Sequence, residues 1–152
     1  MAQRGSCDDT SGGIANPTGE LSWYDAMKWA AGLEHLPCGL TDGSTPGDWR
    51  LPTKTEWMAM VAYAKSQAYT YPALTNGAGT AKWSEGNIFA GVATSHIYWS
   101  STSDSGSTSS AWTCAMWNGN MGMGGVDKSI ASIRVWPVRG GQSGTFGSLR
   151  VE

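Results

Sequence analysis

Two helix-start signals within the first 66 residues constrain the fold of this chain more than any other feature. Ser22 is followed three positions later by Asp25, and Thr53-Lys54-Thr55-Glu56 is a capping box of the Thr-x-x-Glu form. Apolar residues recur at helical spacing after each signal. We therefore predict helices over 22–35, ended by Pro37, and over 53–66. Their expected buried residues are Ala26, Trp29, Ala30, Leu33 and Leu36 in the first helix, and Trp57, Met60, Val61 and Ala64 in the second.

The second half of the chain is typical of β-structure. Residues 97–102 are β-prone, and residues 111–117 alternate between two faces. Asn118-Gly119 is a strong hairpin signal, which predicts a return strand over 120–126 despite the glycines of that segment. A last strand is expected over 133–139. Together these elements predict an α+β fold in which two helices pack on a small, mostly antiparallel twisted sheet with long loops.

Irregular segments are expected at both ends and in the middle of the chain. Residues 1–19 indicate an irregular N-terminal arm and residues 142–152 a loose C-terminal tail, which leaves one domain over 20–141. Residues 67–95 show no clean periodicity and are expected to form a long surface excursion. Such a loop in a compact domain is uncommon and often functional.

The charge content excludes several function classes. Only 14% of the residues are charged, the net charge is −2, and there is no basic run, so no nucleic-acid partner is expected. No apolar stretch approaches the ~20 residues of a membrane-spanning helix, so no membrane insertion is expected. Few charges and many Gly, Ser and Thr favour a compact, loop-rich fold displayed outside the cytoplasm, and 9 Trp argue against disorder.

Four sequence blocks carry a resemblance to a known family. They are Gly47-Asp48-Trp49-Arg50-Leu51-Pro52-Thr53, Tyr98-Trp99-Ser100-Ser101-Thr102, Ala111-Trp112, and Val135-Trp136-Pro137-Val138-Arg139-Gly140-Gly141. Over about residues 20–141 the chain resembles DUF1566, the Legionella collagen-like protein C-terminal domain family. The resemblance implies a C-type-lectin-like fold, related to the formylglycine-generating-enzyme group. It also implies an extracellular or cell-surface location, and in some cases a homo-trimer.

The resemblance further implies a ligand-binding role. The named member is an adhesin for sulfated glycosaminoglycans, although the acidic net charge of this chain departs from the basic face such ligands need. Relatives with the same ending look like variable proteins of diversity-generating retroelements, whose segment before the final motif forms a diversified ligand-binding surface. Here that segment is 112–133, and the partner would be a protein or glycan on a cell or phage surface, with help from the 69–95 loop.

Residues within this segment suit recognition on their own chemistry. Exposed aromatic and Met side chains adapt to partners, and Asn supplies donors and acceptors. An alternative places Met121 and Met123 under the sheet as packing residues. The expected ligand-binding residues are Trp112, Trp117, Asn118, Asn120, Met121, Met123, Ser129 and Ile130.

Two other functions stay open beside ligand binding. One is a structural module, such as a trimerising tip on a fibrous stalk, without its own ligand. The other is an enzyme of the formylglycine-generating type, but such enzymes use two cysteines near the C-terminal end of the fold, where this chain has only Cys114. A nucleophilic pair of Cys114 with His96 is a further alternative. We expect no enzyme, no catalytic residue, no cofactor and no metal; Glu85-Gly86-Asn87 and Asn118-Gly119-Asn120 only faintly resemble calcium-lectin motifs.

Several residues have expected structural roles. Arg50 and Arg139 should tie loops together, with stacking on a Trp. A disulfide of Cys38 with Cys114 or Cys7 is expected from the surface setting. Core roles are expected for Trp49, Trp57, Trp99 and Trp136, and turn-forming roles for Asp42, Asp48 and Asp104.

Overall fold

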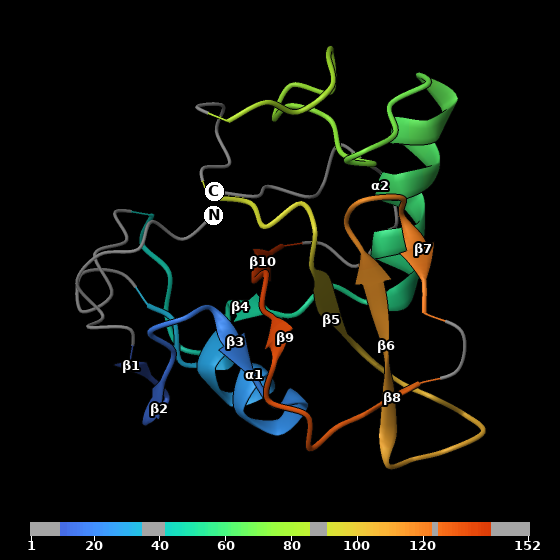
Figure 1. The fold of residues 1–152 in the computed structure, drawn as a ribbon. Coiled ribbons are helices and arrows are strands. Elements are labelled where there is room, and N and C mark those ends of the chain that lie inside the picture. The colour runs from blue at the N-terminus through green and yellow to red at the C-terminus, as the bar shows by residue number, and fades with distance from the viewer. Residues whose placement is uncertain (1–9, 35–41, 86–90, 123–124, 141–152) are drawn as a thin grey trace.

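Two helices lie on either side of a central sheet (Figure 1). The computed structural model describes residues 10–34, 42–85, 91–122 and 125–140. In these ranges the helices are α1 (Trp23–Ala31) and α2 (Lys54–Ser66). The strands are β1 (Thr10–Ser11), β2 (Ile14–Ala15), β3 (Glu20–Leu21), β4 (Trp49–Arg50), β5 (Ile97–Ser103), β6 (Ser110–Ala115), β7 (Asn120–Met121), β8 (Val126–Asp127), β9 (Ile133–Arg134) and β10 (Val138–Arg139).

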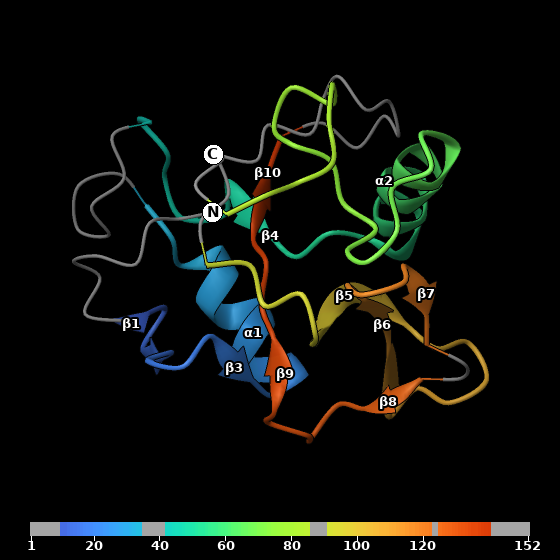
Figure 2. The ribbon, with the colours of Figure 1, turned by 45° about the horizontal axis from the view of Figure 1, so that its top comes forward.

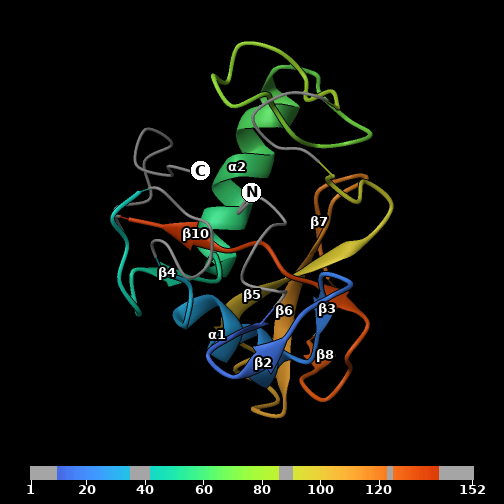
Figure 3. The same ribbon diagram turned by 90° about the vertical axis from the view of Figure 1, so that its left-hand side faces the viewer.

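The largest sheet confirms the expected α+β fold with a mostly antiparallel sheet. Its strand order is β3-β9-β5-β6-β7, and β8 also pairs with β6. Its pairings are antiparallel except that of β5 with β9, which is parallel at Tyr98 and Arg134. Figure 2 shows α1 beside β3 and β9, and α2 beside β7 at the opposite end of the sheet. A separate pair of β4 and β10 lies between the two helices (Figure 3).

Both helices begin where their capping residues predict. The Ser22 hydroxyl accepts a hydrogen bond from the Asp25 backbone N–H at 3.3 Å and donates to the Asp25 carboxylate at 3.0 Å. In α2, the capping box is complete: Thr53 Oγ1 accepts from the Glu56 N–H, and Glu56 Oε2 accepts from the Thr53 N–H. These bonds satisfy N–H groups that have no partner within the helix.

The first helix ends earlier than predicted, at Ala31, with Gly32 as its C-cap residue. A Cβ on residue 32 would lie 2.3 Å from the Gly12 backbone nitrogen. Gly12 belongs to the turn between β1 and β2, a short hairpin that packs on α1. The sequence analysis placed residues 10–15 in an irregular arm, but they form this hairpin. Leu33 is still buried, whereas His35 and Leu36 lie outside the described residues.

The two predicted C-terminal strands are each divided. The return strand over 120–126 becomes β7 and β8, which pair with opposite ends of β6. Between them, the Gly125 N–H donates to the Asp104 carboxylate at 2.9 Å instead of joining the ladder. The last strand becomes β9 in the main sheet and β10 beside β4. Pro137 separates these two, and it has no N–H to donate to a continuous ladder.

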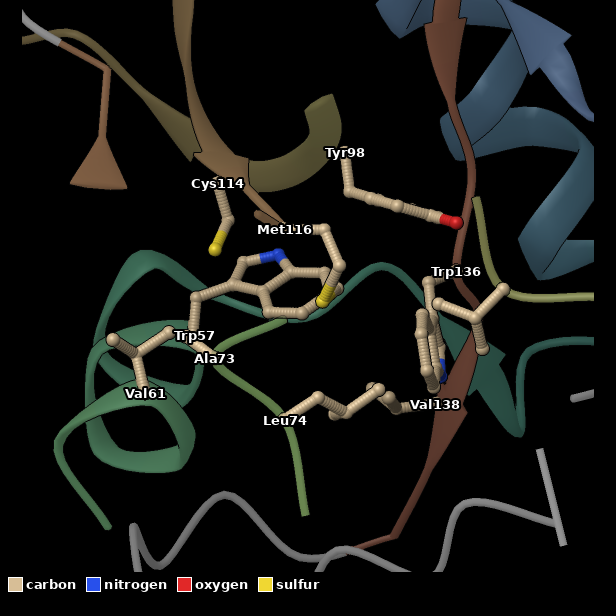
Figure 4. Packing of buried hydrophobic residues seen from close by; sticks show 10 residues of the cluster. Trp57, Val61, Ala73, Leu74, Tyr98, Cys114, Met116, Trp136 and Val138 are labelled. Carbon is tan, nitrogen blue, oxygen red and sulfur yellow. The ribbon is translucent and has the colours of Figure 1, made fainter. Parts of the chain in front are cut away.

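Two apolar clusters fill the space on opposite faces of β5 and β6, because successive side chains alternate across a sheet. The α2-side cluster contains Trp57, Val61, Ala73, Leu74, Val92, Tyr98, Cys114, Met116, Trp136 and Val138 (Figure 4). The α1-side cluster contains Leu21, Ala26, Ala30, Leu51, Trp99, Ala111 and Ile133.

The four tryptophans expected in the core are all buried, which confirms their structural role. Trp49 and Trp99 have no exposed surface, and Trp57 and Trp136 are nearly as buried. The Trp99 indole N–H donates to the Leu21 carbonyl at 2.8 Å, and the Trp57 indole N–H donates to the Trp99 carbonyl at 3.1 Å. These bonds join β3, β5 and α2 inside the core.

The 67–95 segment lies partly in the core, so the expectation of a surface excursion was wrong for part of it. Ala73 and Leu74 are buried in the α2-side cluster, and so is Val92. Thr75 and Lys82 form an isolated β-bridge, which closes a short loop. The sequence pattern does not reveal this burial, because a buried run of only a few residues is too short to show a helical or strand period.

Arg50 and Arg139 tie distant segments together, as expected. The two Nη atoms of Arg50 donate to both carboxylate oxygens of buried Glu56 at 2.8 and 2.7 Å, and Nη2 also donates to the Gly140 carbonyl. Arg139 Nη1 lies 2.9 Å from Asp42 Oδ2 and donates to the Asp42 carbonyl. The expected stacking of arginine on Trp is not seen; the cation–π contacts of the described residues come from lysines.

The three aspartates expected in turns accept backbone hydrogen bonds there. Asp42 accepts from the Ser44 N–H, Asp48 from the Thr45 N–H and Asp104 from the Gly106 N–H. The N–H groups of Gly125 and Gly106 lower the pKa of the Asp104 carboxyl below its usual value, because they stabilise the carboxylate.

Cys114 is a free thiol in the α2-side cluster, so the expected disulfide with Cys38 is wrong. The alternative pairing of Cys38 with Cys7 lies outside the described residues. Burial raises the pKa of the Cys114 thiol to about 12. Within the described ranges, no helix combines the length and apolar character needed to cross a bilayer.

Replacing Trp99 by Ala should lower the free energy of unfolding by about 3–5 kcal/mol, because it empties a core site and removes the bond to Leu21. Urea denaturation measures the change. Tyr24→Ala is the control, since Tyr24 is 57% exposed and should change stability by less than about 0.5 kcal/mol. Equal midpoints for the two variants would contradict the central role of Trp99.

Cys114 should resist alkylation in the folded protein, because its thiol is buried and stays protonated at neutral pH. In a variant with Cys7 and Cys38 replaced by Ser, iodoacetamide at pH 8 should leave the native protein unmodified. The same reagent should add one group once urea unfolds the chain. Mass spectrometry measures both states, and rapid modification of the native protein would refute the placement of this thiol.

Candidate functional site

Five of the eight predicted binding residues lie near the two ends of strand β6. Trp117, Asn118 and Asn120 follow Ala115, where β6 turns into β7. Ser129 and Ile130 follow β8, which pairs with the start of β6 at Ser110. Five residue steps at ~3.3 Å each place these ends about 17 Å apart. Figure 1 shows the β6–β7 turn near α2 and the chain after β8 at the far end of the sheet.

The tip surface, defined here as Tyr71, Trp117, Asn118 and Asn120, combines two exposed aromatic side chains with the amides of exposed Asn120 and half-buried Asn118. Tyr71 is 70% exposed, more than any other large apolar side chain in the described ranges, and Trp117 is 37% exposed. The Tyr71 N–H donates to the Trp117 carbonyl at 2.9 Å, so these residues are neighbours across 46 positions of sequence. Tyr71 adopts a left-handed backbone conformation with φ of 55°, which is uncommon for a residue with a Cβ.

The tip packs closely against α2 because residue 119 is a glycine and has no Cβ. Gly119 has a φ of +67°, and a Cβ at this position would lie 2.3 Å from Val61 Cγ1 and 2.9 Å from the Ala73 Cβ. The Gly119 N–H also donates to the Ala115 carbonyl, which closes a four-residue turn over 116–119. A second bond, from the Ala73 N–H to the Met116 carbonyl, fixes the 71–73 segment beside the turn. The exposed side chains therefore project from a turn whose backbone is packed against α2 and the 71–73 segment.

The amide groups of the tip retain free hydrogen-bonding capacity. Asn118 Oδ1 accepts from the Asn120 N–H at 2.9 Å, which orders the turn. Within the described part of the chain, the Asn118 Nδ2 group and the Asn120 side chain make no hydrogen bond. A carboxamide offers two donor hydrogens and an acceptor oxygen, so both side chains can bond to a ligand.

Three predicted residues are less available to a partner. Trp112 is half-buried, and Lys54 Nζ lies 3.2 Å from its ring centroid, which covers that side of the ring. Met121 is half-buried against the α2-side cluster, as the packing alternative proposed. Met123 lies outside the described residues.

Ser129 and Ile130 belong to a second surface at the opposite end of β6. The base surface consists of Tyr24, Ser129 and Ile130, of which Tyr24 is 57% and Ile130 40% exposed. The Trp23 N–H donates to the Lys128 carbonyl, which brings the start of α1 beside this segment. Buried Lys128 anchors it: Nζ donates to Ser103 Oγ at 2.7 Å and the Thr108 carbonyl at 2.8 Å, and lies over the Trp23 ring.

The residues weighed for catalysis do not form a joint site in the described structure. His96 Nδ1 lies 3.2 Å from Ser95 Oγ, and His96 Nε2 lies 4.0 Å from Glu20 Oε1. The Cys114 thiol is buried among apolar side chains instead. Among the described residues, no three His, Cys, Asp or Glu side chains are grouped closely enough to hold a metal ion.

Tyr71 is the functional candidate that residue-by-residue sequence reasoning did not single out. The segment 69–95 was expected to assist binding, but its periodicity gave no reason to prefer Tyr71 over its neighbours. The sequence signal available was the Tyr-Pro turn at 71–72. The contact with Trp117 that selects Tyr71 exists only in the folded chain.

Gly119→Ala should lower the free energy of unfolding by about 2–4 kcal/mol, since it combines an unfavourable φ with a collision against Val61. Gly13→Ala is the matched control: Gly13 has a φ of +78°, but nothing lies within 4 Å of its added Cβ, so only the backbone cost of about 1–2 kcal/mol applies. Thermal and urea melts compare the two. Equal losses would mean that the tip does not depend on its contact with α2.

Comparison with known proteins identifies a family. No curated protein and no solved structure matches the chain. The Lcl C-terminal domain family matches residues 4–139, from before the β1–β2 hairpin to the end of β10. Because this match covers most of the 152 residues, the chain belongs to the Lcl C-terminal domain family.

Proposed function

We propose that this domain is a recognition module that binds a protein or glycan ligand through its tip surface. The observation that carries the proposal is that exposed Tyr71 and Trp117, joined by a backbone hydrogen bond, lie beside two asparagines on a turn packed against α2. Large aromatic side chains lose little conformational entropy on binding and contribute strongly to interfaces. Because the tip is already ordered, ligand binding does not have to offset the entropy lost in ordering it.

The setting we propose is extracellular or cell-surface, within a C-type-lectin-like fold. Membership of the Lcl C-terminal domain family supports a surface setting. Two helices on a mostly antiparallel sheet are compatible with the lectin-like class. We also propose that the segment 112–133 varies among relatives, as in retroelement-diversified proteins. Trp117 and Asn120 support this, since their side chains are exposed and can vary without disturbing the core.

We propose no catalytic role and no resident cofactor. The buried protonated thiol of Cys114 is poorly suited to nucleophilic attack, and His96 interacts with Ser95 and Glu20. Incubating the protein with esters, thioesters and cysteine-containing peptides and analysing the products tests this part of the proposal. Turnover of any of them would contradict it.

A second candidate function, a homo-oligomeric structural module such as a trimer, is favoured by the base surface. Tyr24 and Ile130 are exposed apolar side chains at the end of the domain opposite the tip. Assembly through them would leave the tip free, so the two functions are compatible. Analytical ultracentrifugation of Tyr24→Ser/Ile130→Ser beside the parent protein distinguishes an oligomer from a monomer.

Replacing Trp117 and Asn120 together by Ala should abolish ligand binding and leave the protein folded, with a loss of about 1–3 kcal/mol of unfolding free energy because Trp117 is only 37% exposed. Binding is measured by screening the parent protein on glycan and surface-protein arrays, then titrating each hit with the double variant. Ser129→Ala/Ile130→Ala is the control, with a similar change at the base surface. If the tip variant unfolds, the tip is needed for folding and the binding proposal is not supported. If the tip variant stays folded and binds fully, the ligand site lies elsewhere on the domain.

A further inference from the structure

The tip surface is the meeting point of two long uncharged stretches of the chain. Residues 66–81 and 105–126 contain no Asp, Glu, Lys, Arg or His, although 14% of the whole chain is charged. The structure brings them together through the bonds from Tyr71 to Trp117 and from Ala73 to Met116. Folding therefore concentrates two separate uncharged segments at one place.

An uncharged surface of this kind restricts the ligand. A carboxylate or sulfate placed here would lose water without gaining a cation to pair with, which is unfavourable. One positive charge, Lys65 of α2, directly precedes the 66–81 stretch. A single ammonium group is far from the basic face that a sulfated chain requires.

The groups that the tip does offer match a hydroxyl-rich ligand. The faces of aromatic rings carry partial negative charge, and the C–H groups on one face of a pyranose ring carry partial positive charge, so the two attract. The carboxamides of Asn118 and Asn120 both donate and accept, as do sugar hydroxyls. A stable protein interface needs about 800 Å² and 20–30 residues per partner, far more than these four side chains supply.

We infer that the ligand of the tip surface is an uncharged saccharide, stacked on Trp117 and Tyr71 and hydrogen-bonded by Asn118 and Asn120. This inference rests on the proposed function and narrows its ligand class. Binding of such a ligand involves no release of counterions, so its affinity should be nearly independent of salt.

The test uses the whole chain and hexasaccharides of glucose, mannose, galactose and N-acetylglucosamine, with a heparin hexasaccharide for comparison. Calorimetric titration should show binding of at least one neutral hexasaccharide, with less than a twofold change in Kd between 50 and 500 mM NaCl. Trp117→Ala and Tyr71→Ala should each weaken binding at least tenfold. Tyr24→Ala, an exposed aromatic at the base surface, and Lys65→Gln should leave the Kd unchanged.

Trp117→Phe keeps an aromatic face and should restore most of the affinity, which separates loss of stacking from loss of folding. Heparin binding that exceeds neutral binding, or neutral binding unaffected by Trp117→Ala and Tyr71→Ala, would overturn the inference. So would the absence of binding to every neutral hexasaccharide at millimolar concentration. If the arrays instead find a protein ligand that needs Trp117 and Asn120, the proposed function stands and the saccharide inference alone fails.

Discussion

Burial of strand β5 from both faces is the constraint on which the rest of the structure depends. Trp99 enters the α1-side cluster and bonds to the Leu21 carbonyl, while Tyr98 enters the α2-side cluster beside Trp57 and Trp136. Because neighbouring residues of one strand serve opposite faces, neither cluster can rearrange without moving β5. The strand thereby sets the positions of β6 and β9, and through β6 the position of the tip.

The two ends of β6 are stabilised in different ways, which suits ligand binding at the tip and a structural role at the base surface. At the tip, the groups that maintain the fold are backbone amides, Gly119 and the Asn118 carboxamide oxygen, so the side chains of Trp117 and Asn120 are free to face a partner. At the base, a buried side chain, Lys128, performs the anchoring. A surface whose support comes from the backbone tolerates side-chain variation, whereas one that depends on a particular lysine does not.

Local sequence patterns were reliable where the cause of a structure is itself local. Each capping signal marks its helix start because both partners of the hydrogen bond lie within three residues. The end of α1 was misjudged: Gly32 caps the helix where the chain meets Gly12, a residue twenty positions earlier. The burial of Ala73 and Leu74 was missed for a similar reason, since their partners come from α2 and the β6–β7 turn.

The sequence by itself determined the family, the α+β class, the tryptophan core and the hairpin at 118–119, because motif spacing, side-chain volume and turn preference are properties of short segments. Only the tertiary structure decided how the eight predicted binding residues are distributed. Strand pairing sends Trp117, Asn118 and Asn120 to one end of β6 and Ser129 and Ile130 to the other. It also brings Tyr71 beside Trp117. Such neighbours depend on which strands pair and on how loops return to the sheet, and no pattern within a single segment specifies that.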